Sequence, residues 1–245
     1  MGRSMILWVV ERALAARNVG RAIVATDDRR IFEAVSRAGF EAVMTASDHA
    51  SGSDRLAEVA GSLEGIEILV NVQGDEPLIS PLTIEAAVEE MLRSKEAAMV
   101  TTSEAIENIS DVLNPDVVKV VTDRTGRALY FSRSPVPYPR EAVSQHGTLE
   151  AALAADASLL SSFRKHTGLY VYRRSFLLEY ATWPQSALER TESLEQLRAL
   201  ERGAIIKVIE AHAPSIGVDT AADLERVRQI FEADASEKQK LTSNI

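Results

Sequence analysis

The side chains best suited to chemistry in this sequence are two aspartates in glycine-containing turns. Asp75 follows the apolar run 66–72 in a Gln-Gly-Asp-Glu-Pro turn, and Asp219 follows Gly-Val shortly before the last helical pattern. A buried strand that ends in such a turn carries its carboxylate to the edge of the sheet where α/β proteins bind ligands. One or two carboxylates also suit a Mg²⁺ ion that substrate phosphates share. The pair therefore predicts magnesium-assisted chemistry at a phosphate group.

Each aspartate also has a purely structural interpretation, which the sequence leaves open. Asp75 could lie in an exposed surface turn. Asp219 or Thr220 could cap the helix that follows, with Asp223 in its first turn. Only the two carboxylates taken together favour a metal site.

Other polar residues have the right chemistry to bind a ligand. Ser51 and Arg55 lie in a loop that leads into a helix, where backbone N–H groups and an arginine can bind a base edge or an anion. The alternative is an ordinary serine N-cap beside an exposed arginine. His166 begins a strand pattern and Glu195 a helical one, and a single histidine beside a strand is more often a structural hydrogen-bonding group than a catalyst. These residues are therefore informative only as a set.

Strand patterns alternate with amphipathic helical patterns along the chain. Leu224, Val227 and Ile230 have the spacing of a helix with one buried face. Alternation of this kind predicts an α/β fold with a mostly parallel sheet and helices on both of its faces. The strands are expected at 22–25, 41–44, 66–72, 98–101, 117–121, 169–172 and 205–208.

A proline-rich segment interrupts this alternation. Pro135, Pro137 and Pro139 cannot donate to a β-ladder and impose an extended path. We interpret 129–184 as an inserted subdomain, while 1–128 and 185–231 form the main core. The polar tail 232–245 has no sustained apolar face and is expected to fray.

Composition and missing motifs exclude several classes of protein. The 245 residues include no cysteine, which excludes a disulfide framework and cysteine-ligated zinc and favours a cytoplasmic location. The formal net charge of -9 argues against nucleic acid as a partner. The apolar run 5–10 is too short for a signal peptide or a membrane span. No G-x-G-x-x-G, P-loop or G-x-S-x-G motif supports a dinucleotide enzyme, a P-loop enzyme or an α/β-hydrolase.

Short segments of the chain follow one another in a recognisable order. They are Val24–Asp28, Ser51–Arg55, Asn71–Pro77, Asn114–Val121, Tyr130–Arg133, His166–Tyr170, Leu194–Arg198 and Gly217–Thr220. In this order they resemble the 3-deoxy-manno-octulosonate cytidylyltransferases, the CMP-Kdo synthetases of lipopolysaccharide synthesis. The joint order is far more specific than any one segment.

The resemblance implies a Rossmann-like nucleotide-diphospho-sugar transferase fold and transfer of a cytidylyl group from CTP to the sugar acid Kdo. It implies Mg²⁺ as the cofactor, held by Asp75 and Asp219. It also implies that the protein is a homodimer that pairs through the subdomain 129–184. The same subdomain is implied to contribute to sugar binding. By the same similarity Ser51, Arg55 and Gln73 lie against the cytidine. The residues implied to hold the sugar acid are Arg133, His166, Tyr170, Glu195 and Gln196.

The family pattern differs from this sequence at the front. Family members have an N-terminal strand and a loop with an arginine and lysines around the triphosphate, then a Gly-Lys-Pro-Met turn. Gly2-Arg3-Ser4-Met5 stands where that turn would be. We therefore expect the chain as written to lack the strand and loop, with Arg3 a partial substitute, and the simplest explanation is a start site placed too far downstream. Two alternatives stay open, namely a cytidylyltransferase for another acidic sugar and a degenerate paralogue without catalysis.

Overall fold

The structure is a computed structural model, and it describes residues 2–49 and 51–242. The chain divides into two units, each of which gathers segments that are distant in the sequence. The first unit comprises Met1–Ser47, Val72–Glu85 and Ala213–Ile245, and the second comprises Asp48–Asn71 and Ala86–His212.

The first unit contains the strand–helix–strand pattern that the sequence predicts. Its elements are α1 (Met5–Leu14), β1 (Ile23–Thr26), α2 (Arg29–Arg37), β2 (Glu41–Met44) and α11 (Ala221–Thr242). Strands β1 and β2 pair in parallel, which requires the crossover that α2 provides. Leu7 and Val10 of α1 pack with Val24 and Val35 in a small core, so one apolar face of α1 is buried.

Helix α11 extends the chain to Thr242 and includes much of the tail that is expected to fray. The rings of Trp8 in α1 and Phe231 in α11 lie 4.5 Å apart between centroids. The Arg12 guanidinium lies 5.6 Å from the centroid of the Phe231 ring. These contacts hold α11 against α1 within the first unit. Residues 243–245 of the expected tail lie outside the described residues.

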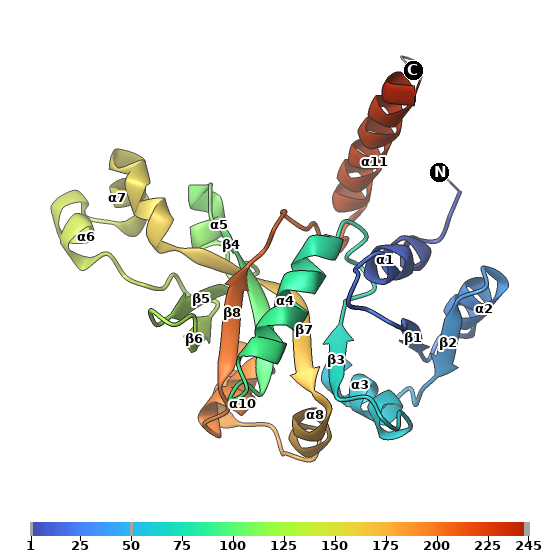
Figure 1. Ribbon diagram of the computed structural model, residues 1–245. Coiled ribbons are helices and arrows are strands. Elements are labelled where there is room, and N and C mark those ends of the chain that lie inside the picture. Colours follow the sequence, from blue (N-terminus) through green and yellow to red (C-terminus); the bar gives the residue numbers. More distant parts are fainter. Residues whose placement is uncertain (1, 50, 243–245) are drawn as a thin grey trace. The chain divides into compact units, whose positions relative to one another are not determined.

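The second unit is built around a sheet in which β7 pairs with three other strands. The strands are β3 (Ile68–Asn71), β4 (Met99–Ala105), β5 (Lys119–Thr122), β6 (Ala128–Ser132), β7 (Arg164–Arg173) and β8 (Ile206–Glu210). Their hydrogen-bonded order is β6-β5-β7-β4-β8, and β3 also pairs with β7. Figure 1 shows β8, β4 and β7 side by side. Because β7 is long, it can pair with β5 near its start and with β3 near its end.

The expected α/β class is confirmed, but the prediction of a mostly parallel sheet is wrong for this unit. Strands β4 and β8 are parallel, whereas β7 is antiparallel to β3, β4 and β5, and β5 is antiparallel to β6. The connections explain the difference. A short turn joins β5 to β6, so these two strands are antiparallel. The long segment 133–163 then crosses to the other side of β5, where β7 begins beside Lys119, the residue that also pairs with Ser132 at the end of β6, and β7 therefore runs antiparallel to β5 as well.

Helices cover both faces of this sheet, as the sequence predicts. The helices of the unit are α3 (Gly52–Gly61), α5 (Ile109–Leu113), α6 (Arg140–His146), α7 (Leu149–Ala155), η1 (Ala157–Ser162), α8 (Arg174–Tyr180), α9 (Ala187–Glu192) and α10 (Gln196–Glu201), and α4 (Pro81–Arg93) continues into it. Helices α3, α8 and α10 share a core with Val208 of β8. Helix α4 lies beside Ile209. Since successive strand residues point to opposite faces, these two neighbours mark the two covered sides.

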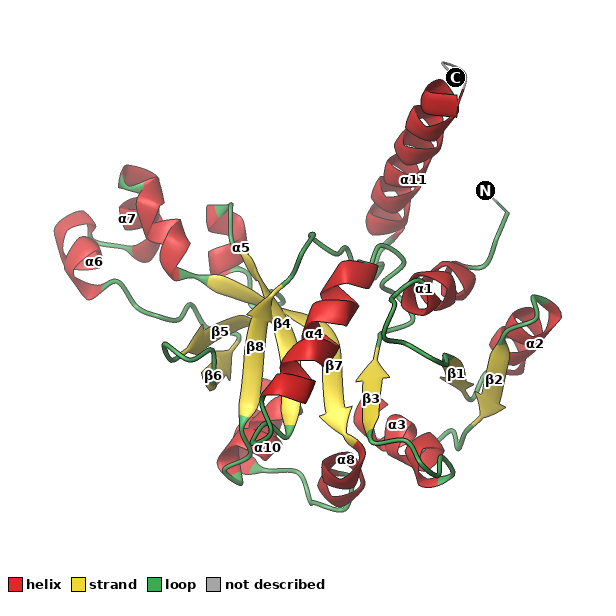
Figure 2. Cartoon of the chain, in the orientation of Figure 1, coloured by secondary structure: helices red, strands yellow, loops and turns green. Residues whose placement is uncertain are grey.

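A second, smaller core lies under α5 and α7. It is formed by Ile106, Val112, Leu153 and Phe163, all of them buried. In Figure 2, α6 and α7 lie beyond the end of the sheet that β5 and β6 form. Over the described ranges 2–49 and 51–242, no helix combines the length and the apolar character that crossing a membrane requires.

Candidate active site

The first unit brings Asp75 and Asp219 into one place. The backbone N–H of Val218 donates to the carbonyl oxygen of Asp75 at 2.9 Å, which fastens the segment before α11 to the turn at 74–75. A Cβ atom added at Gly217 would lie 3.9 Å from Glu76 Oε1 and 4.0 Å from Asp219 Oδ2. The Ser215 hydroxyl also donates to the Glu76 carboxylate. The two turns that the sequence singles out therefore form a single acidic site.

The charges at this site repel one another. Burial raises the pKa of Asp75 above its ordinary value, and the negative charge of Asp219 raises that pKa further. No basic side chain among the described residues pairs with either carboxylate. Two carboxylates of this kind are hard oxygen ligands that fit Mg²⁺. Among residues 2–49 and 51–242, no three or more His, Cys, Asp or Glu side chains gather in a way that could hold a metal ion.

The residue that caps the start of α11 is Thr220 and not Asp219. The Thr220 hydroxyl accepts from the backbone N–H of Asp223 at 3.2 Å, and the Asp223 carboxylate accepts from the Thr220 backbone N–H at 2.9 Å. Thr220 and Asp223 thus satisfy the start of α11 reciprocally. The Asp219 side chain is exposed and is not needed for the cap.

Arg3 of the first unit is engaged in local contacts. Its guanidinium donates to the Glu11 carboxylate, with Nη1 2.8 Å from Oε2. It also lies 4.9 Å from the centroid of the Trp8 ring. Both partners belong to α1, so the side chain lies along that helix.

The residues predicted to contact the cytidine are divided between the two units. Gln73 belongs to the first unit, where its carbonyl oxygen accepts from the Glu76 backbone N–H at 3.2 Å. Ser51 and Arg55 belong to the second unit. The Ser51 hydroxyl accepts from the Asp54 backbone N–H at 3.2 Å, so Ser51 is the N-cap of α3. A role of these residues at the nucleotide stays a prediction.

In the second unit, strand β7 brings His166 and Tyr170 together. Four residues along a regular strand span about 13 Å, yet these two rings are only 5.3 Å apart between centroids. The pairing with β4 explains the short distance, because Thr101 lies opposite Tyr170 while Thr102 lies opposite Thr167. The register of β7 with β4 thus shifts between these two pairs, and an irregularity of this kind bends a strand and redirects its side chains.

The Thr101 hydroxyl lies between His166 and a backbone carbonyl. Its oxygen is 2.8 Å from the Leu169 carbonyl oxygen and 2.9 Å from His166 Nε2. With the hydroxyl proton on the carbonyl oxygen, Nε2 carries the ring proton and Nδ1 is the acceptor; with the hydroxyl proton on Nε2, the two ring nitrogens exchange these roles. Burial lowers the pKa of His166 to about 4, so the ring is neutral near pH 7.

Glu195 is held at two points by residues that the sequence analysis does not single out. Its carboxylate accepts from the Ser53 hydroxyl, with Oγ 2.7 Å from Oε2. Its carbonyl oxygen accepts from the Tyr180 hydroxyl at 2.6 Å. Ser53 also lies 3.3 Å from the Tyr172 hydroxyl. Ser53 falls within the polar segment 51–55, but no spacing rule could connect it to a glutamate so far along the chain.

Gln196 and Arg133 complete the predicted sugar-binding set, and their side chains differ in whether they have hydrogen-bond partners. Gln196 is 4% exposed, and its Nε2 has no hydrogen-bond partner among the described residues. Arg133 donates to the carbonyl oxygens of Glu192 at 2.6 Å and Pro115 at 3.0 Å. These bonds fasten the chain just after β6 to the end of α9 and to the segment before β5. A contact of Arg133 with sugar stays a prediction.

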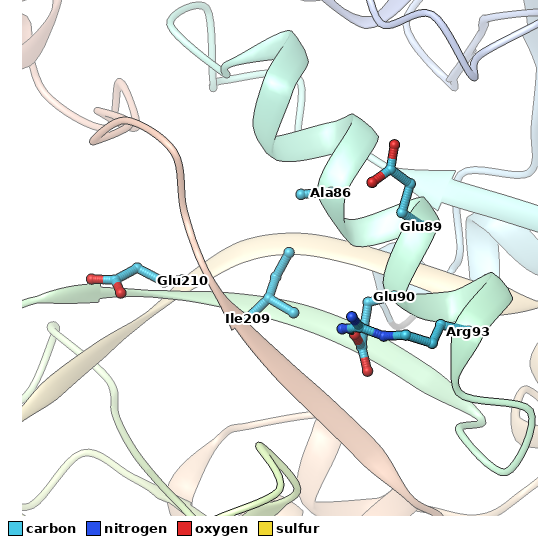
Figure 3. Close-up of a pocket in the computed structure, with 6 residues that line it drawn as sticks. All are labelled: Ala86, Glu89, Glu90, Arg93, Ile209 and Glu210. Atoms are coloured by element: carbon cyan, nitrogen blue, oxygen red, sulfur yellow. Dashed lines mark hydrogen bonds and ion pairs between the residues drawn. The ribbon is translucent and has the colours of Figure 1, made fainter.

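A separate cavity lies between α4 and β8 (Figure 3). Its volume is about 340 Å³, and its lining includes Glu89, Arg93 and Glu210. Glu90 also lines it and is engaged with the Ser94 hydroxyl at 2.5 Å and with Arg93. None of the predicted site residues lines this cavity, which is therefore distinct from the predicted site.

Comparison with known proteins identifies the family of this chain. The sequence model of the cytidylyltransferase family matches residues 1–209. The 3-deoxy-manno-octulosonate cytidylyltransferase of Trichlorobacter lovleyi is 50% identical over 228 residues, covering 93% of this chain and 88% of the relative. The enzyme of that name from Pseudomonas fluorescens is 48% identical over 235 residues, covering 95% and 89% of the two chains.

Solved structures show the same relationship. The CMP:2-keto-3-deoxy-manno-octonic acid synthetase complexed with CTP matches with a TM-score of 0.82 and 41% identity, covering 94% of this chain and 88% of the other. A glucose-1-phosphate thymidylyltransferase from Bacillus anthracis, at 16% identity and a TM-score of 0.60, shares the fold. The chain belongs to the 3-deoxy-manno-octulosonate cytidylyltransferase family.

Proposed function

We propose that this protein transfers the cytidylyl group of CTP to 3-deoxy-manno-octulosonate and releases pyrophosphate. The observation that carries the proposal is identity of about half the residues to relatives of that name over more than nine-tenths of the chain. The similar structure in complex with CTP supports the nucleotide. The meeting of Asp75 and Asp219 in the first unit supports chemistry at a phosphate.

The reaction requires one bond to form and one to break. The anomeric hydroxyl oxygen of the sugar acid bonds to the α-phosphorus of CTP, and the bond from that phosphorus to the bridging oxygen of the β-phosphate breaks. Pyrophosphate leaves with the bonding electrons, and the hydroxyl proton passes to solvent or to a base. Positioning and charge stabilisation can supply most of the catalysis in such a transfer, without a covalent enzyme intermediate.

Asp75 and Asp219 are the residues that would hold Mg²⁺. When bound, the ion would supply positive charge against the phosphates and favour ionisation of the attacking hydroxyl. The chain's own contribution is to hold two carboxylates together against their repulsion, through the bond from Val218 N–H to the Asp75 carbonyl oxygen. The remaining ligands would be phosphate oxygens and water.

The sugar acid would meet groups of complementary type in the second unit. His166 is neutral near pH 7, so one of its ring nitrogens can accept a hydrogen bond and the other can donate one, while Glu195 offers carboxylate oxygens to hydroxyl groups. Gln196 adds a buried amide whose Nε2 is available as a donor within the described part of the chain. Acceptors for hydroxyls and a donor for a carboxylate are the groups that recognition of a sugar acid requires.

Release of pyrophosphate tests this proposal and its substrate at once. The protein is incubated with CTP and Mg²⁺ and with Kdo, a sialic acid or no sugar. Release with Kdo alone is expected. Release with the sialic acid instead would replace Kdo by another acidic sugar, and release with no sugar would show a nucleotide hydrolase.

We further propose that the protein acts in the cytoplasm as a homodimer that pairs through 129–184. Leu129 and Tyr138 in this segment are each 60% exposed, and apolar groups at the surface favour a partner. Light scattering is expected to give twice the monomer mass of 26.8 kDa. A monomer at micromolar concentration would contradict the assembly and leave the activity untouched.

A further inference from the structure

Ser53 is a buried hydroxyl that links helix α3 to Glu195. It is 3% exposed and lies in the first turn of α3, between Ser51 and Arg55. Its Oγ is 2.7 Å from Glu195 Oε2. A bond to an ionised acceptor is stronger than one between neutral groups. The link therefore has a defined geometry and a charged acceptor.

The direction of the protons in this link follows from the donor inventory. The Ser53 hydroxyl has one proton, which it donates to the Glu195 carboxylate. The Tyr172 hydroxyl, 3.3 Å from Ser53 Oγ, must then be the donor in their contact. Tyr172 is buried in the sheet, and burial raises its pKa, so it keeps the proton that it donates. The chain of bonds runs from Tyr172 through Ser53 to Glu195.

These bonds leave Glu195 with one carboxylate oxygen in use and one available. Oε2 accepts from Ser53, while Oε1 has no hydrogen-bond partner within the described residues. The backbone of Glu195 is held separately, because its carbonyl oxygen accepts from Tyr180. Without Ser53, the backbone would stay in place but the carboxylate could rotate about its side-chain torsions.

We propose that Ser53 is a positioning residue for the sugar acid, because it holds the Glu195 carboxylate so that Oε1 can accept a sugar hydroxyl. The assignment rests on the proposed function, in which Glu195 contacts the sugar. Ser53 itself touches no substrate in this account. Since it lies on the helix of the predicted nucleotide contacts Ser51 and Arg55, it also ties the two predicted binding regions of the second unit together.

Equilibrium binding of Kdo tests the role without requiring turnover. Calorimetry is performed on the full chain with Ser53→Ala, which is expected to raise the dissociation constant for Kdo about tenfold, as loss of a bond to a charged group would. Tyr172→Phe removes only the donor to Ser53 and is expected to raise it about threefold. Ser62→Ala is the matched control, because that hydroxyl ends the same helix and donates to the Val59 carbonyl oxygen. It is expected to change nothing.

A double-mutant cycle separates positioning from a general loss of structure. In a Glu195→Ala background, Ser53→Ala is expected to have no further effect on Kdo binding, whereas structural damage would weaken binding equally in both backgrounds. Unchanged binding in the single variant, or equal effects in both backgrounds, would overturn the assignment. Turnover of the unmodified protein is measured in parallel. Binding of Kdo without turnover would count against the proposed function alone, and absence of Kdo binding would overturn both.

Discussion

At the scale of single residues, the acidic pair of the first unit lowers the stability of the fold but provides carboxylates that can bind a cation. The pKa of Asp75 is raised because the carboxylate is partly buried and faces the charge of Asp219. An acid whose pKa is higher in the folded state is less favourable to the fold when it is ionised, so the cost appears as pH rises past its ordinary value. A bound cation would relieve it. Groups whose pKa values are shifted at a cost in stability are common at functional sites.

Removing either carboxylate is expected to separate activity from stability. Asp75→Asn or Asp219→Asn should lower magnesium-dependent turnover by roughly 10² to 10³, the usual effect of losing one electrostatic group at a reacting centre. The melting temperature near pH 7 should stay equal or rise, because the repulsion is gone. Asp123→Asn, at the turn between β5 and β6, is the control and should keep normal turnover. Normal turnover in either site variant would remove that residue from the metal site.

The low pKa of His166 predicts how the stability of the fold changes at acidic pH. Its pKa is about 4 in the folded chain, against 6.5 for an ordinary histidine, because burial disfavours the charged ring. As pH falls, the unfolded chain therefore takes up a proton on this histidine before the folded chain does. The contribution of neutral His166 to the free energy of unfolding is fully present above pH 6.5 and is lost as pH falls toward 4. Its full size is roughly 3 kcal/mol.

Thermal unfolding between pH 4 and pH 7 measures this contribution. His166→Gln should weaken the dependence of the melting temperature on pH in that window. His146→Gln changes an exposed histidine and should leave the dependence as it is. Equal slopes for the protein and the His166 variant would show that the ring is not buried in its neutral form.

At the scale of elements, α9 and α10 depend on a buried ion pair. Glu189 and Arg198 are each 4% exposed, and Arg198 Nε lies 3.2 Å from Glu189 Oε2 without the alignment of a hydrogen bond. Arg198 also donates to the Trp183 carbonyl oxygen at 2.8 Å, and its guanidinium lies 4.4 Å from the Tyr180 ring centroid. The pair supports the helices that flank Glu195.

Breaking this pair should destabilise the second unit strongly. Arg198→Met leaves Glu189 buried without its cation, which costs about 3 to 5 kcal/mol. The midpoint of urea unfolding should fall accordingly. Adding Glu189→Leu should recover part of the loss, although it also removes the capping box that Glu189 forms with Ser186. A single variant as stable as the unmodified protein would show that the pair contributes nothing.

Local patterns could predict most of the elements but not the directions of the strands. The β-branched runs correspond to strands at the predicted positions, and the spacing of Leu224, Val227 and Ile230 lies in helix α11. Strand β6 was missed because the prolines that follow it dominate the pattern, and the prediction of a mostly parallel sheet failed because pairing depends on long connections. The register shift that brings His166 to Tyr170 depends on the pairing of β7 with β4, which no single strand encodes.

At the scale of the whole molecule, the predicted site residues are shared between two structural units. Asp75, Asp219 and Gln73 belong to the first unit, whereas the helix of Ser51 and the sugar set of Glu195 belong to the second. Motif order could nominate these residues because each lies in a short, distinctive segment. It could not nominate Ser53, Tyr172 or Tyr180, whose roles arise from contacts across long stretches of chain.

The central claim is that the α-phosphate of CTP is transferred to a sugar acid, and following that phosphorus tests it most directly. The protein is incubated with Mg²⁺, Kdo and CTP labelled at the α-phosphate. Label should appear in a sugar nucleotide that needs all three components, with one pyrophosphate released for each label transferred. Label that remains in CTP, or that appears in free CMP without passing through the sugar nucleotide, would contradict the claim.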